Sequence, residues 1–319
     1  MKKAILITIV LFLAGCQALN LPFTSQLQQN EIPQIDVYKG KEGISIKFVP
    51  GAPPDKMVAT SDINSYEVGV VIENRGAADA EGVVALILEK NFMEAAQKFL
   101  AIEGGVEGRE KFTSGGIKDL KFDVNTKALS KENYETNPKP NVQAAACYKY
   151  QTKASAPICI DTSKYRGTAE KGACTESTLY FTEGQGAPVA VTKIESVILI
   201  KNSQAFPYLK IFMENAGRGE VLNRTQTTDA CSDKPAVHSI IHLDSASIGG
   251  KQLSCEPKNA EETLLKLREE KENNYFTCEA AAGTQGFDAG AQSFITDLSI
   301  TLSYGYETTI TKQVELVVV

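Results

Sequence analysis

The sequence predicts an all-β protein made of two tandem β-sandwich domains, with one short helix inserted in the first domain. Two observations support this prediction. Many short segments alternate apolar and polar residues and end at glycine, proline or asparagine, which is typical of half-buried strands between turns. One strand-and-turn pattern also occurs twice, about 141 residues apart, which indicates a duplicated unit of domain size.

The first sixteen residues have the layout of a secretory signal peptide. Lys2 and Lys3 precede an apolar run that closes on small residues before Cys16. The run is shorter than the roughly 20 apolar residues that a membrane-spanning helix needs. Leu13-Ala14-Gly15-Cys16 also resembles the lipobox of prokaryotic lipoproteins, which implies that cleavage leaves Cys16 as a lipid-bearing N-terminus. The alternative is a plain signal peptide with an incidental cysteine.

The composition is that of an acidic globular chain. Of the 319 residues, 43% are hydrophobic and 23% are charged. Cleavage after residue 15 or 16 removes Lys2 and Lys3 from the 33 basic residues, which leaves 31 against 39 acidic residues, about −8 in net charge. The chain lacks the basic stripes that nucleic-acid phosphates require, so we expect no nucleic-acid partner. The polar residues 17–33 predict a flexible tether, and we expect the lipid to be the membrane attachment.

Six cysteines follow Cys16 and predict three disulfides, as expected of an exported protein. They are Cys147, Cys159, Cys174, Cys231, Cys255 and Cys278. Their spacings of 12, 15, 57, 24 and 23 residues lack the close Cys-x-x-Cys pairs that are typical of metal sites. A boundary in the polar segment 161–173 leaves two cysteines before it and four after it. We therefore favour Cys147–Cys159 across a terminal hairpin, Cys255–Cys278 between two strands, and Cys174–Cys231 by elimination, although 15 pairings are allowed.

The predicted strands either alternate apolar and polar residues or are short apolar runs rich in β-branched residues. They cover residues 44–49, 66–72, 83–88, 117–124, 142–150 and 157–160 in the first domain (34–165) and 189–200, 208–213, 237–243, 252–255, 294–302 and 308–319 in the second (166–319). Residues 91–100 instead place Phe92, Ala95, Phe99 and Leu100 at helical spacing and predict the inserted helix. Residues 261–274 suit either a helix or a hairpin, and we favour the hairpin.

The repeated pattern is an apolar strand followed by Glu-Asn-x-Gly. Aligned on that motif, Val68, Val70 and Ile72 match Leu209, Ile211 and Met213, and both sets have the period of two that builds one face of a sheet. Asparagine and glycine supply a turn that tolerates positive φ. The two matches therefore predict equivalent strands in two duplicated modules.

The segments Val68–Asp79 and Leu209–Gly217 resemble the signature strand and turn of CARDB-type immunoglobulin-like modules. Phe48–Pro54, together with Ser303–Tyr306, resembles uncharacterised lipoproteins of small archaeal genomes. These resemblances imply immunoglobulin-like sandwiches on a surface protein that serves adhesion, envelope attachment or scaffolding. They bring no catalytic residues to this chain.

Few residues are candidates for chemistry. His238 and His242 lie in a strand-like segment, where four residues span about 13 Å, so they cannot share one metal ion. We expect structural or surface roles for both, and no catalytic residues, metal or cofactor. Ser247–Gln252 has only part of a phosphate-binding loop and predicts a hairpin turn. Asn223-Arg224-Thr225 is an N-glycosylation sequon, which makes Asn223 a candidate acceptor.

These features lead to three hypotheses of function. The first is a non-catalytic lipoprotein that is anchored at the extracellular face of the cytoplasmic membrane and serves adhesion or envelope assembly. The second is an extracellular module that binds a sugar, peptide or ion at the domain junction, in a pocket lined by tyrosines and carboxylates. The third is a hydrolase with two catalytic carboxylates, which would lie about 5–10 Å apart in a cleft. A sandwich fold hosts many functions and does not choose among them.

Overall fold

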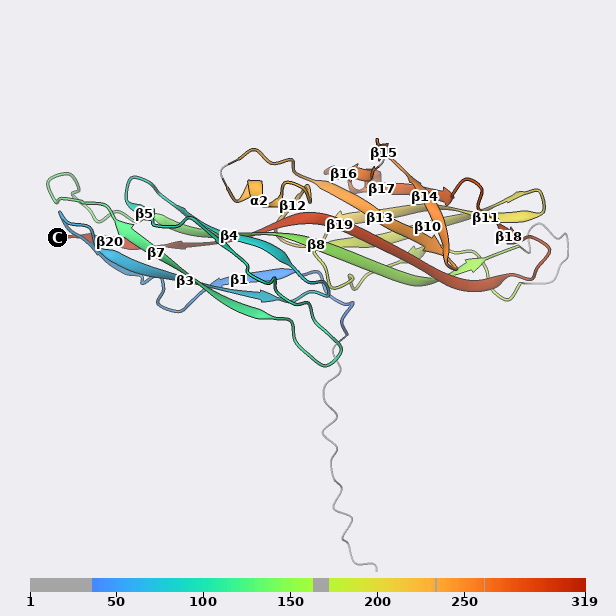
Figure 1. The fold of residues 1–319 in the computed structure, drawn as a ribbon, viewed down its shortest axis with the longest axis horizontal. Helices are drawn as coiled ribbons and strands as arrows, with labels where there is room; N and C mark the ends of the chain where they lie inside the picture. The colour runs from blue at the N-terminus through green and yellow to red at the C-terminus, as the bar shows by residue number, and fades with distance from the viewer. Residues whose placement is uncertain (1–35, 163–171, 233, 261) are drawn as a thin grey trace, which may run out of the picture. The chain divides into compact units, whose positions relative to one another are not determined.

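The computed structural model describes residues 36–162, 172–232, 234–260 and 262–319 (Figure 1). The chain divides into two units, residues 1–33 and 34–319, and the described residues all belong to the second unit. The predicted signal peptide, Cys16 and the tether at residues 17–33 therefore lie outside the described residues. Within the described ranges, no helix is long and apolar enough to cross a membrane.

The all-β prediction is confirmed. Up to residue 162 the strands are β1 (Ile44–Phe48), β2 (Lys56–Ala59), β3 (Ser65–Asn74), β4 (Glu81–Leu88), β5 (Met93–Ala95), β6 (Phe99–Ala101), β7 (Ile117–Thr126) and β8 (Asn141–Ile160). From residue 172 they are β9 (Leu179–Tyr180), β10 (Val189–Lys201), β11 (Gln204–Asn215), β12 (Glu220–Leu222), β13 (Ile240–Ile248), β14 (Lys251–Glu256), β15 (Lys258–Asn259), β16 (Glu262–Lys266), β17 (Tyr275–Ala280), β18 (Phe287–Asp288), β19 (Phe294–Gln313) and β20 (Glu315–Val318). The described helices are short: α2 (Thr227–Ala230) and the 3-10 helix η1 (Lys271–Asn273).

The strands form layers that enclose one hydrophobic core. One sheet has the order β1-β3-β7-β5, and a larger sheet runs β6-β4-β8-β19-β13. The β13–β14 hairpin continues the larger sheet into β14-β17-β11-β10-β9. Alternating burial along β3 and β11 places their apolar side chains in this core, as the period of two predicts. Most of the buried apolar residues form one cluster that includes residues from Ile44 to Val318, so both halves of the chain contribute to the main core, and a smaller separate cluster surrounds Cys147 and Cys231.

The longest feature of the fold is the antiparallel pair β8 and β19. Each strand has 20 residues, and they pair at every position from Phe294↔Ile160 to Gln313↔Asn141. This pairing joins a strand before the predicted boundary at residues 165/166 to a strand after it (Figure 1). The contacts do not divide residues 34–319 at that point, and the count of two tandem domains is not confirmed.

Two local predictions are wrong and one is partly confirmed. Residues 91–100 contain no helix: the chain forms β5 and β6 as it crosses from one sheet edge to the other, and Phe99 is 41% exposed. Segments 142–150 and 157–160 are one strand, β8, instead of two. In the segment 262–274, β16 confirms a strand in place of a helix, but β16 pairs with β13 and β15 and makes no hairpin with β17.

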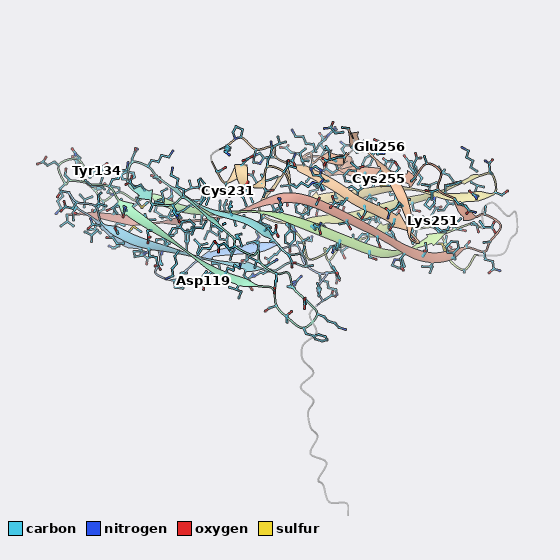
Figure 2. All side chains as sticks on the ribbon, viewed as in Figure 1. Asp119, Tyr134, Cys231, Lys251, Cys255 and Glu256 are labelled. Atoms are coloured by element: carbon cyan, nitrogen blue, oxygen red, sulfur yellow. A yellow bond between two sulfur atoms is a disulfide. The ribbon has the colours of Figure 1, made fainter. Side chains whose placement is uncertain are left out.

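Three disulfides are present, and one of the three favoured pairings is confirmed. Cys255–Cys278 joins the neighbouring strands β14 and β17, whereas the other bonds are Cys147–Cys231 and Cys159–Cys174. Cys231 and Cys255 are labelled in Figure 2. The pair Cys147–Cys159 is impossible because both residues lie on β8, where 12 residues of extended strand span about 40 Å. The pairing Cys174–Cys231, which was assigned by elimination, is wrong for the same reason.

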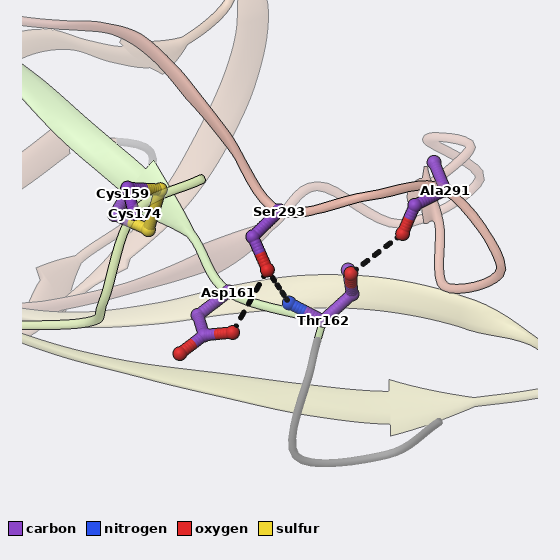
Figure 3. The surroundings of a disulfide bond; sticks show 6 residues. All are labelled: Cys159, Asp161, Thr162, Cys174, Ala291 and Ser293. Carbon is purple, nitrogen blue, oxygen red and sulfur yellow. Dashed lines mark hydrogen bonds between the residues drawn. A yellow bond between two sulfur atoms is a disulfide. The ribbon is translucent and has the colours of Figure 1, made fainter. Parts of the chain in front are cut away.

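The Cys159–Cys174 bond lies at one end of β8, where polar contacts hold the strand to the segment before β19 (Figure 3). The Ser293 hydroxyl donates to the buried Asp161 carboxylate at 2.9 Å and accepts from the Thr162 amide at 3.2 Å. The Thr162 hydroxyl donates to the Ala291 carbonyl at 2.7 Å. This end of the long strand pair is therefore fixed by a covalent bond and by buried hydrogen bonds.

Candidate functional site at the central strand pair

Four buried tyrosines meet at the middle of β8 and β19. Tyr148 pairs with Tyr306 and Tyr150 pairs with Tyr304 in the strand register. Their ring centroids are 5.6 to 6.4 Å apart, in tilted and edge-on arrangements that aromatic pairs favour. Each half of the chain contributes one Tyr-x-Tyr pair. The cluster therefore lies where the two halves meet.

The tyrosine hydroxyls hold equivalent segments of the two halves. Tyr150 donates to Asn74 Oδ1 at 3.1 Å, and Tyr306 donates to Asn215 Oδ1 at 3.0 Å. Each asparagine amide then donates to a carbonyl four residues on, that of Ala78 or Gly219. The two Glu-Asn-x-Gly motifs thus make the same contacts, as a duplicated unit predicts.

The glycine of that motif is required for a different reason from the positive φ that the sequence suggested. Neither Gly76 nor Gly217 has positive φ. A Cβ on Gly76 would overlap the Tyr150 hydroxyl, and a Cβ on Gly217 would overlap the Tyr306 hydroxyl. Glycine is needed because the tyrosine approaches the backbone closely, which corrects the prediction of a left-handed turn.

The remaining hydroxyls are also bonded inside the protein. Tyr148 accepts from the Ile44 amide at 3.0 Å, and Tyr304 lies 2.9 Å from the Thr152 hydroxyl and accepts from the Val189 amide. Burial raises the pKa of Tyr306 to about 12 and raises the pKa of the other three tyrosines further. All four are therefore neutral hydrogen-bonding groups that join the strands, and their rings are closed to a ligand.

A polar hollow of about 470 Å³ lies beside the middle of β8 and β19. Its charged lining consists of three carboxylates, Asp79, Glu81 and Asp244, and three cations, Lys149, Lys153 and Arg224. The buried Tyr150 and Tyr304 also border it. In the described part of the chain Lys149 and Lys153 make no side-chain hydrogen bond or ion pair, so these two ammonium groups are the ones a ligand could use.

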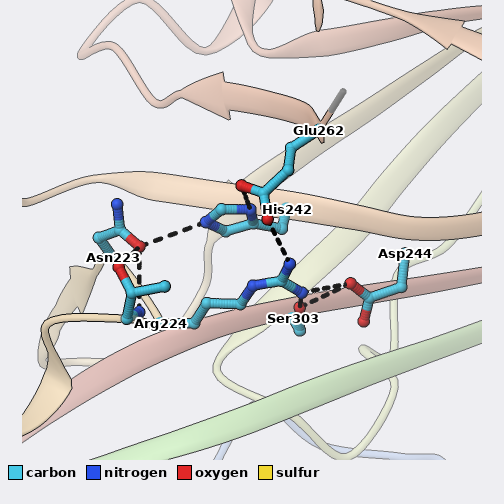
Figure 4. A network of polar contacts seen from close by, with 7 residues as sticks. Asn223, Arg224, His242, Asp244, Glu262 and Ser303 are labelled. Carbon is cyan, nitrogen blue, oxygen red and sulfur yellow. Dashed lines mark hydrogen bonds and ion pairs between the residues drawn. The ribbon is translucent and has the colours of Figure 1, made fainter. Parts of the chain in front are cut away.

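Arg224 is the centre of a polar network at one side of this hollow (Figure 4). Its Nη1 donates to Asp244 Oδ1 at 2.6 Å and to Ser303 Oγ at 2.7 Å, and its Nη2 donates to Glu262 Oε1 at 3.1 Å. The Ser303 hydroxyl donates in turn to Asp244 at 2.9 Å. Arg224 therefore ties β13, β16 and β19 together, and the Ser303 hydroxyl lies between the Asp244 carboxylate and the Arg224 guanidinium.

The two histidines have separate surroundings. His242 is buried on β13: its Nε2 lies 3.3 Å from Asn223 Oδ1 and its Nδ1 lies 3.4 Å from Glu262. Burial, helped by the charge of Arg224, lowers the pKa of His242 and keeps the ring neutral. His238 is half-exposed and pairs with Glu220 at 3.1 Å. Asn223, the candidate glycosylation site, is half-buried and accepts from Thr225, and its modification stays a prediction.

Sequence reasoning missed the tyrosine cluster and the Arg224 network. The tyrosines had a signal, because Tyr148-Lys149-Tyr150 and Tyr304-Gly305-Tyr306 repeat the same spacing in the two halves. The Arg224 network had none, since its members come from segments that only the fold brings together. The predicted hairpin turn at Ser247–Gln252 is confirmed, and Lys251 donates to the carbonyls of Gln285 and Gly286.

A like-charge pair near this region predicts a pH-dependent stability. Glu307 lies directly opposite Glu220 on paired strands, and burial, followed by the charge of Glu220, raises the pKa of Glu307. Because the pKa of Glu307 is higher in the folded than in the unfolded protein, the folded state binds the proton more tightly. The protein gains the full stabilisation from this proton below the unfolded-state pKa and loses it as the pH rises through the folded-state pKa. We expect Glu307→Gln to stabilise the fold at pH 7 by about 0.2–1 kcal/mol and this gain to vanish below pH 4, measured by thermal unfolding.

The matched control is Glu315→Gln, for which we expect a stability change of the opposite sign. Hydrogen bonds from Asn137 and Lys56 lower the pKa of Glu315. Glu315→Gln should therefore destabilise the protein at pH 7 and lose its effect at low pH. Equal behaviour of the two variants across this pH range would contradict both assignments.

Comparisons with known proteins leave the family open. No family model matches the chain, and no curated protein matches it, so the resemblance to CARDB modules has no support from them. Similar solved structures include "BspA_C_WT" and the C-terminal domain of the Streptococcus agalactiae AgI/II polypeptide BspA. Each is 10% identical, and the matches cover 81% of this chain and 94% and 93% of theirs, with a TM-score of 0.11. A TM-score that low carries no argument about function.

Proposed function

We propose that this protein is a non-catalytic lipoprotein of the cell surface that serves adhesion or envelope assembly through protein–protein contacts. Three disulfides are typical of an oxidising, extracellular environment. The lipobox-like Leu13-Ala14-Gly15-Cys16 would hold the chain at the outer face of the cytoplasmic membrane. Two or more acyl chains on Cys16 would give a stable anchor, whereas one chain binds reversibly.

The observation that carries this proposal is the uninterrupted pairing of β8 with β19. Twenty paired positions at about 3.3 Å per residue extend for about 65 Å. The tyrosine cluster fixes the middle of this pair, and Cys159–Cys174 fixes one end. Such a stiff element suits a protein that holds binding surfaces away from the membrane.

The polar groups that resemble catalytic residues support a structural role. Ser303 donates to Asp244, and His242 has an amide oxygen and a carboxylate at its two ring nitrogens. Serine nucleophiles are instead usually activated by a histidine or lysine base within hydrogen-bonding reach of the hydroxyl. Arg224 is occupied by two carboxylates. These contacts favour stabilisation of the β13–β19 region over an acyl-transfer or carboxylate mechanism.

A second candidate is an extracellular ligand-binding module, and the 470 Å³ hollow favours it. Its free ammonium groups, Lys149 and Lys153, suit an acidic sugar or peptide. Loss of such a ligand in the double variant Lys149→Glu/Lys153→Glu, with cell-surface attachment retained, would favour this function over adhesion.

Anchoring is tested with the variant Cys16→Ser in the native host. We expect the unaltered protein to remain with the membrane, to be cleaved by protease added to intact cells, and to gain about six hydrogens in mass on reduction. Cys16→Ser should lose the lipid mass and leave the membrane fraction. Loss of cell–cell adherence in the same variant would support adhesion. A protein that is protected in intact cells, or that carries free thiols, would contradict the proposal.

A further inference from the structure

A cavity of about 310 Å³ lies under the crossing from β5 to β6, away from the hollow described above. Its inner wall is apolar, formed by the buried side chains of Leu86 and Met93 with Leu88. Ile87 and Phe99 border it and are 46% and 41% exposed. This volume is at the lower end of the range of small-molecule sites, which are mostly apolar with few polar groups.

Half-exposed apolar side chains at this place need an explanation. The sequence pattern placed Phe99 on the apolar face of a helix, but the chain forms two short edge strands there and leaves the ring 41% exposed. Exposed large apolar groups cost free energy in water, and a contiguous group of them beside a cavity is typical of a ligand site.

The charged groups of the cavity are unbalanced. Lys90, Lys98 and Lys127 line it, against one carboxylate, Glu94. Among the residues that the structure describes, none of these three lysines makes a side-chain hydrogen bond or ion pair. Three cations and one anion give a net charge of about +2 beside the apolar wall. Although the chain as a whole is acidic, the local positive charge of this cavity attracts anions.

We propose that this cavity binds a small amphiphilic carboxylate of the fatty-acid class. The alkyl chain would cover Leu86, Leu88 and Phe99, and the carboxylate would lie among Lys90, Lys98 and Lys127. A short anion such as acetate would gain nothing from the apolar wall, and an uncharged alkyl compound would gain nothing from the lysines. Both halves of the ligand are therefore needed. The proposal is independent of lipidation at Cys16 and of the adhesion function.

Methionine methyl groups give a direct test. The described chain contains Met57, Met93 and Met213, all of them buried, and Met93 alone among them lines this cavity. With ¹³C-methyl methionine, decanoate should shift the Met93 resonance in a saturable manner and leave Met57 and Met213 unchanged. Acetate should shift none of them. Equal shifts of all three methyl groups, or no shift of Met93 at millimolar decanoate, would overturn the proposal.

Charge reversal tests the role of the lysines. Lys98→Glu/Lys127→Glu should weaken decanoate binding at least tenfold, while Lys149→Glu/Lys153→Glu, which makes the same charge change in the other hollow, should leave it within twofold. Decanol should bind the unaltered protein at least tenfold more weakly than decanoate. This comparison needs no variant, so it decides the question even where the cavity variant unfolds. Equal binding of decanol and decanoate would contradict the proposed carboxylate contacts.

Discussion

Replacing Cys147 and Cys231 by serine is expected to lower the free energy of unfolding by about 4–5 kcal/mol. The bond closes a segment with a sequence separation of 84 residues, the longest of the three, against 15 and 23 for the others. Because the chain-entropy cost of closing a loop grows with the logarithm of its length, this bond restricts the unfolded chain most. Urea unfolding at equilibrium under non-reducing conditions measures the change.

The position of this bond adds a local effect. Cys147 and Cys231 are buried in a small apolar cluster with Ala85, Ala145 and Leu222, which covers one face of β4 and β8 beneath α2. Two serines would leave hydroxyls among apolar side chains and loosen that cover. We expect hydrogen exchange of residues 220–231 to become faster, while exchange in β10 and β11 follows global unfolding.

The matched control is Cys159→Ser/Cys174→Ser. Its loop of 15 residues predicts a loss of about 3 kcal/mol. If this control variant is the less stable of the two, loop length does not determine the contribution of these disulfides.

The parts of the fold that the sequence predicts are those set by local alternation. β3 and β11 were expected because large apolar residues recur at every second position and a polar turn follows them, and β4 and β10 were expected as apolar, β-branched runs of strand length. The middle of β8 was missed for the same reason. There the buried positions are Thr152 and Ala154, which are too small or too polar to look like a core face, although their exposed neighbours alternate with them correctly.

The errors elsewhere come from contacts between distant segments. Residues 91–100 have a helical spacing of apolar side chains, but pairing of β5 with β7 and of β6 with β4 outweighs that local preference. The disulfides depended on one assumption, a hairpin between Cys147 and Cys159, and a continuous β8 removes it. The site also shows that local patterns are found and distant contacts are not. Asn74 and Asn215 were identified by their repeat, whereas their tyrosine partners were missed because they lie 76 and 91 residues away in the sequence.

Replacing Gly76 by alanine is expected to destabilise the protein by at least about 3 kcal/mol. Besides the overlap with the Tyr150 hydroxyl, the new Cβ would lie 2.6 Å from the carbonyl oxygens of Glu42 and Gly186. Those two carbonyls belong to the segments before β1 and β10, so the methyl group could be accommodated only by moving backbone in both halves. Overpacking of this kind costs about 1–3 kcal/mol where side chains can yield, and more where backbone must move.

Gly217 provides the comparison that separates a side-chain contact from a backbone contact. An alanine there would meet mainly the Tyr306 side chain and Pro188 Cβ, at 2.8 Å for the latter. Tyr306→Phe removes the overlapping hydroxyl, so Gly217→Ala/Tyr306→Phe should be more stable than the sum of its single changes predicts, by about 0.5–3 kcal/mol. Gly76→Ala/Tyr150→Phe should recover less, because the two carbonyls remain.

Both cycles can be measured by urea unfolding. Equal recovery in the two halves would mean that the tyrosine hydroxyl alone excludes a side chain at each glycine. Additive behaviour in both would mean that the glycines serve their own turns, as the sequence first suggested. The expected asymmetry instead follows from what surrounds each glycine: Gly217 meets the side chains of Tyr306 and Pro188, whereas Gly76 meets a tyrosine and two backbone carbonyls, one from each half of the chain.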